Sequence, residues 1–228
     1  MEDLLKIMKR LRGPNGCPWD REQTHESLRT NVIEEAYEVV DAIESKDDSA
    51  LCEELGDLLL QIAFHCVIAQ EENRFDYEQV EKRICDKLVS RHSHIFGNDT
   101  AENAEEVLKL WRKNKETEKG NRSLSEAMEA VPASFPGLMK SFKVQEKAAS
   151  AGYGSKNLSE AVALWEEKSN RLKEGIDHTN KADLEQLFGE LLFSVVNVCR
   201  FFKIDPEIAV SKTVKRFVNG FSQKGENE

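Results

Sequence analysis

Apolar residues recur along this chain three and four positions apart, which is the period of an amphipathic α-helix. The alternation of apolar and polar residues that marks a β-strand is nearly absent. The segment from Leu58 to Ala69 is apolar on almost every side, and such a helix is expected to be buried. The pattern predicts an all-α fold with helices near residues 2–12, 21–45, 49–72, 77–91, 102–117, 122–130, 138–150, 157–174, 181–203 and 206–221.

Two stretches of the chain resemble each other. ELGDLLLQIAFHC at 54–66 and LFGELLFSVVNVC at 187–199 share a glycine, two leucines and the final cysteine in register. A repeat of helical units predicts an all-α bundle protein with two similar domains. We expect these domains at 1–115 and 138–221, a polar connector with Pro and Gly at 116–137, and a disordered tail at 222–228.

Pairs of carboxylates stand on the two helices around this apolar segment. Glu35 and Glu38 form one pair, and Glu54 and Asp57 form the other. Residues three apart share a helix face, so each pair projects together. Such pairs are a weak signal alone, because a chain with this many acidic residues contains roughly 8 of them by chance. A solvated acidic face is the ordinary interpretation.

The position of these carboxylates favours a metal site. Glu54 and Asp57 share one stripe of an otherwise apolar helix with Gln61 and His65. Carboxylates that line a helical interior are costly unless they are paired or bind a cation. Oxygen ligands suit Mg²⁺ or Mn²⁺ better than zinc. The sequence therefore predicts a divalent cation, Mg²⁺ with Mn²⁺ as the alternative, held by Glu35, Glu38, Glu54 and Asp57.

Two basic residues could contact a phosphorylated ligand of such a cation. Lys87 and Arg91 are four residues apart and share one face of a predicted helix. Mg²⁺ held by carboxylates usually also binds the phosphates of a substrate. The alternative is a basic face whose aliphatic stems cover neighbouring apolar surface.

The composition restricts the class of partner. The chain has 228 residues and a formal net charge of −10, which disfavours binding to nucleic acid or to an anionic membrane. The apolar segment is interrupted by Gln61 and His65, and it is too short to span a bilayer. The five cysteines are scattered and form no C-x-x-C pair, so we expect a cytoplasmic protein.

Four motifs resemble those of the MazG family of all-α nucleoside triphosphate pyrophosphohydrolases. They are GCPWDREQTHESL at 16–28, EEAYE at 34–38, EELGD at 53–57 and KLVSRHSHIFG at 87–97. The resemblance implies hydrolysis of a nucleoside triphosphate to the monophosphate and pyrophosphate. It also implies that the four carboxylates hold Mg²⁺, and that the protein is a homodimer whose helices pack into four-helix-bundle arrangements.

The resemblance assigns further roles. Lys87 and Arg91 match a basic pair that reaches the triphosphate. Trp19 matches an aromatic residue that stacks on the nucleobase, although packing in the core is an equal alternative. Gln61 is a further candidate for substrate binding. The proton of the attacking water would be accepted by Glu34 or by a ligand carboxylate such as Glu38.

The second half departs from the motif. Asn170 and Leu187 replace two glutamates, and Glu190 replaces the aspartate, so that only Glu167 and Glu190 remain as ligands. The sequence therefore predicts a structural or dimerising second half and activity in the first. The main alternative is an inactive protein of the same fold that binds nucleotide or a partner protein. A carboxylate-bridged redox metal protein is a weaker alternative.

Overall fold

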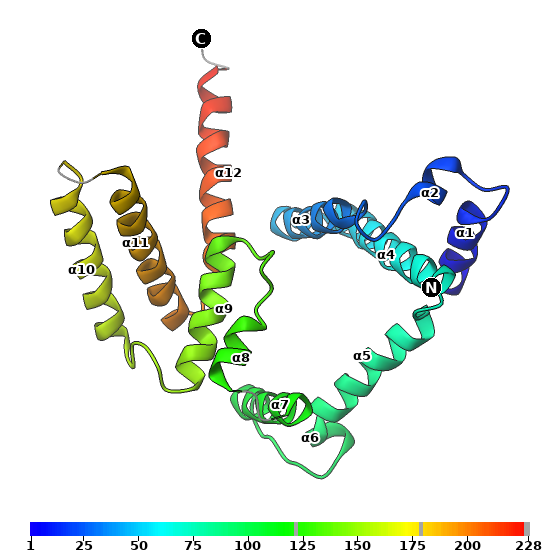
Figure 1. The fold of residues 1–228 in the computed structure, drawn as a ribbon, viewed down its shortest axis with the longest axis horizontal. Coiled ribbons are helices and arrows are strands. Elements are labelled where there is room, and N and C mark those ends of the chain that lie inside the picture. The colour runs from blue at the N-terminus through cyan, green and yellow to red at the C-terminus, as the bar shows by residue number, and fades with distance from the viewer. Residues whose placement is uncertain (121–122, 178–179, 226–228) are drawn as a thin grey trace. The chain divides into compact units, whose positions relative to one another are not determined.

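The computed structural model describes residues 1–120, 123–177 and 180–225. Every regular element in these ranges is a helix (Figure 1). The predicted all-α fold class is therefore confirmed. Among the same residues, no helix combines the length and the hydropathy that crossing a membrane requires.

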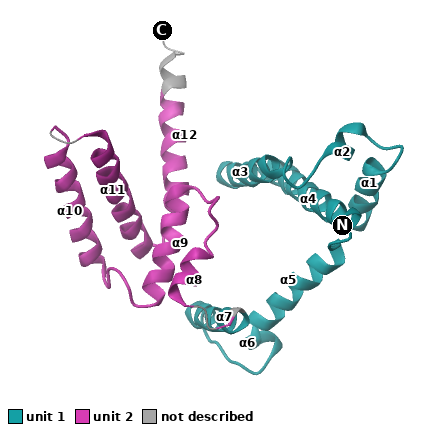
Figure 2. Cartoon of the chain, viewed as in Figure 1, with its two compact units in different colours: residues 1–118 teal, residues 119–228 magenta. Residues whose placement is uncertain are grey.

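The chain divides into two compact units, Met1–Glu118 and Lys119–Glu228 (Figure 2). The helices of the first unit are α1 Glu2–Arg12, α2 Pro18–Glu22, α3 Arg29–Ser45, α4 Asp48–Glu71, α5 Tyr77–Arg91, α6 Ser93–Phe96 and α7 Ala104–Lys119. Those of the second unit are α8 Leu124–Glu129, α9 Gly137–Ser150, α10 Leu158–Gly175, α11 Lys181–Phe201 and α12 Pro206–Gly225.

Helix boundaries differ from the predicted ones at several places. Residues 23–28 form a turn between α2 and α3 rather than the first part of one helix over 21–45. The Ser27 hydroxyl bonds Gln23 Oε1 at 2.7 Å, and it accepts the Thr24 N–H at 3.0 Å. These side chains stabilise a turn that competes with the helix. Helix α12 also continues to Gly225, into the predicted tail, whose residues 226–228 lie outside the described residues.

The first unit is built around a hairpin of α3 and α4. Lys46 ends α3 in the left-handed conformation, with φ 57°, and reverses the chain. The Asp47 carboxylate then accepts the N–H groups of Ser49 and Ala50 and caps α4. These two residues bring the C-terminal end of α3 next to the N-terminal end of α4, so that the two carboxylate motifs face each other.

The core of the first unit lies where α1 packs on the C-terminal half of α4. Its buried residues are Met8, Leu28, Phe64, Val67 and Ile68. Burying one such side chain contributes about 1.5–3 kcal/mol. Leu28 comes from the end of the 23–28 turn, and it therefore attaches that turn to α4.

The N-terminal half of α4 is less buried than the sequence predicts. Ala63 to Ala69 are mostly buried, but Leu59 is 39% exposed and Ile62 is 41% exposed. On α3, Ile33 and Tyr37 are also about half exposed. The expectation that 58–69 is buried on every side is therefore wrong for its first part. The reason is that α3 covers only one side of this part of α4 within the hairpin.

The second unit contains a corresponding hairpin of α10 and α11, with α9 packed on α11. Helix α8 lies inside the predicted connector and packs on α9. The buried Gln145 side chain donates to the Phe193 carbonyl at 2.8 Å and joins α9 to α11. The two similar stretches of sequence lie on α4 and α11, which are the second helices of the two hairpins.

Candidate metal centre

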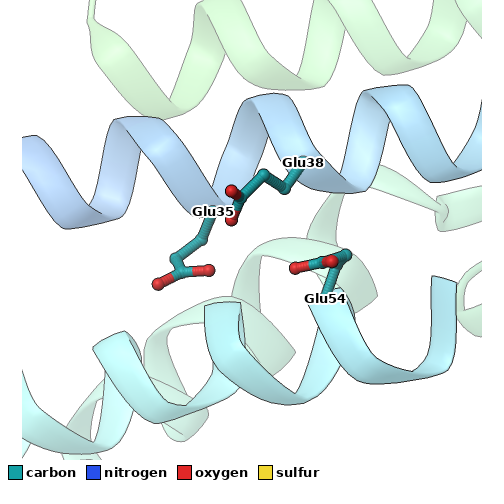
Figure 3. A group of neighbouring side chains, drawn as sticks. All are labelled: Glu35, Glu38 and Glu54. Atoms are coloured by element: carbon teal, nitrogen blue, oxygen red, sulfur yellow. The ribbon is translucent and has the colours of Figure 1, made fainter. Parts of the chain in front are cut away.

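Three carboxylates converge between α3 and α4. Glu35 and Glu38 project from α3 toward Glu54 on α4 (Figure 3). One oxygen atom from each of the three side chains lies within 4.8 Å of the others. Asp57 lies one turn further along α4, is half-buried, and interacts electrostatically with Glu35 and Glu54. We call these four residues the carboxylate cluster.

The electrostatics of the carboxylate cluster disfavour four negative charges. Burial raises the pKa of Glu35, and the neighbouring Asp57 and Glu38 raise it further. Burial also raises the pKa of Glu54, and Glu38, Glu53 and Asp57 add to the effect. Like charges at short range favour either protonation or a bound cation.

Gln61 supplies a buried polar group beside the carboxylate cluster. Its side-chain amide donates to Glu35 Oε1 at 3.3 Å. The residue is 6% exposed, and its Oε1 atom is buried without a hydrogen-bond partner. A buried acceptor without a donor is uncommon in folded proteins and indicates an absent partner, such as a water molecule or a ligand.

The donor set fits a divalent cation. Its atoms are carboxylate oxygens, with an amide oxygen nearby, and such ligands suit Mg²⁺ and Mn²⁺. No sulfur or imidazole belongs to the convergent group Glu35, Glu38 and Glu54. A hydrated cation would account for both the site's negative charge and the orphaned Gln61 oxygen.

The raised pKa values predict a pH dependence of stability without divalent cations. Glu35 and Glu54 each have a higher pKa in the folded than in the unfolded chain. At a pH between the unfolded and the folded pKa of such a residue, the folded chain binds more protons. The free energy of unfolding therefore falls as pH rises through this window. Urea titrations in EDTA at several pH values between 4 and 7 measure this free energy. It should depend less steeply on pH in the Glu35→Gln/Glu54→Gln variant than in the wild type. Equal slopes would contradict the predicted repulsion.

The segment that carries Trp19 is fastened to α4 by Arg12. The Arg12 side chain is 7% exposed and forms an ion pair with Glu71 at 2.7 Å. It also donates to the carbonyl oxygens of Asp20 and of Gln23. One guanidinium group therefore connects α1, the α2 segment and the end of α4.

Trp19 itself is only partly covered. Its ring meets Phe64 edge to face, with 6.4 Å between the centroids, and the residue is 56% exposed. The structure thus combines the two interpretations of this residue, because one edge packs on the core while much of the side chain faces solvent. Gly16 allows the turn that leads to it, since a Cβ at this position would lie 1.9 Å from the Leu11 carbonyl oxygen.

One member of the basic pair on α5, Arg91, contacts α7. Arg91 forms an ion pair with Glu118 on α7 at 2.7 Å and lies over the Trp111 ring, 5.1 Å from its centroid. The Arg91 hydrogen bonds lower the pKa of Glu118. Lys87 is exposed on the same helix, α5. Glu34 is exposed on α3, outside the group of three convergent carboxylates. The substrate and catalytic roles of these residues stay predictions.

The corresponding place in the second unit contains basic side chains. Glu190 accepts hydrogen bonds from Arg171 at 2.8 Å and from Gln186 at 3.0 Å, and Lys168 lies 3.3 Å away. Lys168 also pairs with Glu167 at 3.0 Å. The hydrogen bond from Gln186, followed by that from Lys168, lowers the pKa of Glu190. The two remaining carboxylates are therefore neutralised by side chains.

This compensation was missed by the sequence argument, which considered only the lost acids. The signal was present in EEKSNR at 166–171, where two basic residues follow Glu167 on the same helix. Helical periodicity places Arg171 one turn after Glu167, facing the partner helix. Side-chain lengths and the packing of the hairpin then decide which acid each cation reaches.

Comparison with known proteins identifies the family. Residues 23–96 match the MazG nucleotide pyrophosphohydrolase domain. The nucleoside triphosphate pyrophosphohydrolase/pyrophosphatase MazG of Thermotoga maritima is 41% identical over 99% of this chain and 85% of its own length. The chain belongs to the MazG family. The nucleoside triphosphate pyrophosphohydrolase of Escherichia coli K12 is 40% identical, over 98% of this chain and 86% of its own length.

The MazG match covers the carboxylate cluster and the basic pair of α5, whereas Trp19 lies before its first residue. The two MazG relatives align over both units of this chain. A crystal structure of a mazG-related protein from Thermotoga maritima aligns with 50% of this chain and 98% of its own length, with 30% identity and a TM-score of 0.44.

Proposed function

We propose that this MazG protein hydrolyses nucleoside triphosphates to the monophosphate and pyrophosphate, with Mg²⁺ as cofactor and Mn²⁺ as a possible substitute. The observation that supports this most strongly is the convergence of Glu35, Glu38 and Glu54 beside a buried, unpartnered Gln61 oxygen. Family membership supports the proposed substrate class, and the carboxylate cluster supports a bound cation.

The residues of the first unit would divide the chemistry among them. Glu35, Glu38, Glu54 and Asp57 would hold the cation. When bound, it would supply positive charge to the phosphates and lower the pKa of a water molecule. Glu38 or Glu34 accepts the proton of the attacking water, whose oxygen bonds to the α-phosphorus while the bond to pyrophosphate breaks. No covalent intermediate on the protein is needed.

Three further side chains would bind the substrate. The exposed part of Trp19 offers a stacking surface for a nucleobase, a contact that tolerates different bases. Lys87 and Arg91 would reach the phosphates after the Arg91 ion pair with Glu118 is exchanged for the ligand. Specificity for one base is not implied by stacking, so we propose a broad, house-cleaning activity.

We also propose a homodimer formed through the exposed apolar faces of the α3–α4 hairpin. Leu59, Ile62, Ile33 and Tyr37 are between 39% and 53% exposed in one chain. Exposed apolar surface of this kind marks an interface. A second α3–α4 hairpin would cover it and complete a four-helix arrangement. Location in the cytoplasm and the lack of affinity for nucleic acid stay predictions from the cysteine pattern and the net charge.

The dimer has a direct test. Sedimentation velocity should give a species of two 26.0 kDa chains for the wild type. Leu59→Lys should shift it toward the monomer, because a charge would be buried in the interface. Ile7→Lys is the matched control, since Ile7 is exposed on α1, outside the hairpin. A wild type that sediments as a monomer, or equal effects of both variants, would contradict the proposed interface.

The activity is tested by pyrophosphate release from a panel of ribonucleoside and deoxyribonucleoside triphosphates. We expect turnover with Mg²⁺ and none with EDTA, and the panel then reports the base and sugar preference. Nucleotide binding without turnover, with either Mg²⁺ or Mn²⁺, would favour the inactive binding protein. Iron content with a visible absorption band would favour the redox alternative.

A further inference from the structure

A hydrogen bond between two histidines connects the turn after Trp19 to the middle of α4. His25 Nδ1 and His65 Nδ1 are 2.7 Å apart. The ring planes differ by 2° and the centroids are 5.0 Å apart. Nitrogens this close exclude face-to-face stacking, so the rings meet edge to edge and share one proton. Neither residue belongs to the carboxylate cluster or has a role in the proposed chemistry.

The surroundings determine which nitrogens carry protons. His25 Nε2 is buried without a hydrogen-bond partner and lies 3.9 Å from a carboxylate oxygen of Glu72. An Nε2–H on His25 would point its positive end toward this carboxylate. The favoured neutral arrangement therefore has His65 Nδ1–H donating to His25 Nδ1.

The charged groups near the histidine pair disfavour a second added proton more than a first. Glu26 interacts electrostatically with His25, and Glu72 is shared with Arg74 at 2.7 Å. Arg12 of α1 and Glu71, at the C-terminal end of α4, pair with each other. A single added proton keeps one Nδ1–H between the rings. A second added proton gives both Nδ1 atoms a hydrogen, so that two N–H groups and two positive charges face each other.

The histidine pair completes the attachment of the Trp19 segment. Arg12 holds the carbonyl oxygens of Asp20 and Gln23, and the Gln23 side chain donates to the Trp19 carbonyl at 3.0 Å. The next side-chain contact with α4 along the turn is His25 with His65. The segment that follows Trp19 is therefore attached to α1 through Arg12 and to α4 through this hydrogen bond.

We propose that the His25–His65 hydrogen bond is a pH-sensitive tether that positions Trp19 for nucleotide binding. It holds while the pair carries one shared Nδ1 proton, and it releases when both rings are protonated. Burial and the charge of His25 lower the pKa of His65, so the stabilising contact is present at neutral pH and is lost as pH falls. The role for the nucleotide rests on the proposed function, whereas the tether does not.

The experiment measures acrylamide quenching of Trp19 fluorescence in the full chain between pH 8 and 5, with Trp111→Phe and Trp165→Phe present. Release of the segment should raise the quenching constant roughly twofold toward the acid end of this range. His65→Asn keeps an N–H near the position of Nδ1 and cannot be protonated, so the transition should disappear. His92→Gln, on a histidine outside the pair, should retain it. Circular dichroism checks that helix content is unchanged.

Two results would overturn the tether: no transition in the chain with both histidines, or the same transition in His65→Asn. A kinetic measurement tests whether the tether affects nucleotide binding. KM for a nucleoside triphosphate should rise at acid pH in the wild type more than in His65→Asn, with similar kcat in the two proteins. Absence of any turnover would contradict the proposed function only, because the quenching measurement needs no activity.

Discussion

Replacing Glu38 by Gln is expected to lower kcat/KM for nucleoside triphosphates by roughly 10²- to 10³-fold, the range seen when one stabilising group of a transition state is removed. Gln keeps the size of the side chain but loses the charge that Glu35, Glu38 and Glu54 combine to offer a cation. Glu38 is exposed, so the loss is not caused by a disturbed core. Steady-state pyrophosphate release measures it.

Glu53→Gln is the matched control for this variant. Glu53 precedes Glu54 on α4, is exposed, and lies outside the convergent group. We expect it to retain wild-type kcat/KM within a factor of about 3. Activity that survives in Glu38→Gln would move the catalytic site away from the α3–α4 hairpin, and the second unit would then have to be reconsidered.

Mg²⁺ is expected to stabilise the first unit strongly. Saturation at about 100 times Kd adds about 2.7 kcal/mol to the free energy of unfolding. For a chain of this size that raises Tm by roughly 5–10 °C relative to EDTA. Glu54→Gln should lose most of the gain, and in EDTA it should be no less stable than the wild type, because it removes one of several repelling carboxylates.

Hydrogen exchange provides the internal control for this effect. Mg²⁺ should slow amide exchange in α3 and α4 and leave α10 and α11 unchanged, since Arg171 and Lys168 already compensate Glu190. Equal protection of both hairpins would show that the second unit also binds the cation. Absence of protection in α3 and α4 would refute the carboxylate cluster as a metal centre.

Much of the site could be predicted from local spacing. Glu35 and Glu38 on one helix, and Glu54 and Asp57 on the next, share faces because three residues make almost one turn. A two-residue connection with Lys46 and Asp47 then leaves little freedom in how the two helices meet. The prediction that Leu59 is buried was wrong, because the sequence of a helix that is apolar on every side does not reveal which neighbour covers each side.

The sequence by itself determined the helical fold class, the family and the pairing of carboxylates, because these depend on periodicity and on residue identity at fixed spacing. Only the tertiary structure decided that the Gln61 oxygen is left without a donor, that Arg171 and Lys168 neutralise the second hairpin, and that His25 meets His65. Each of these depends on contacts between residues 19 to 40 positions apart or on burial by several elements. Helical periodicity carries no information about such contacts, since they depend on how whole helices pack and how far each side chain reaches.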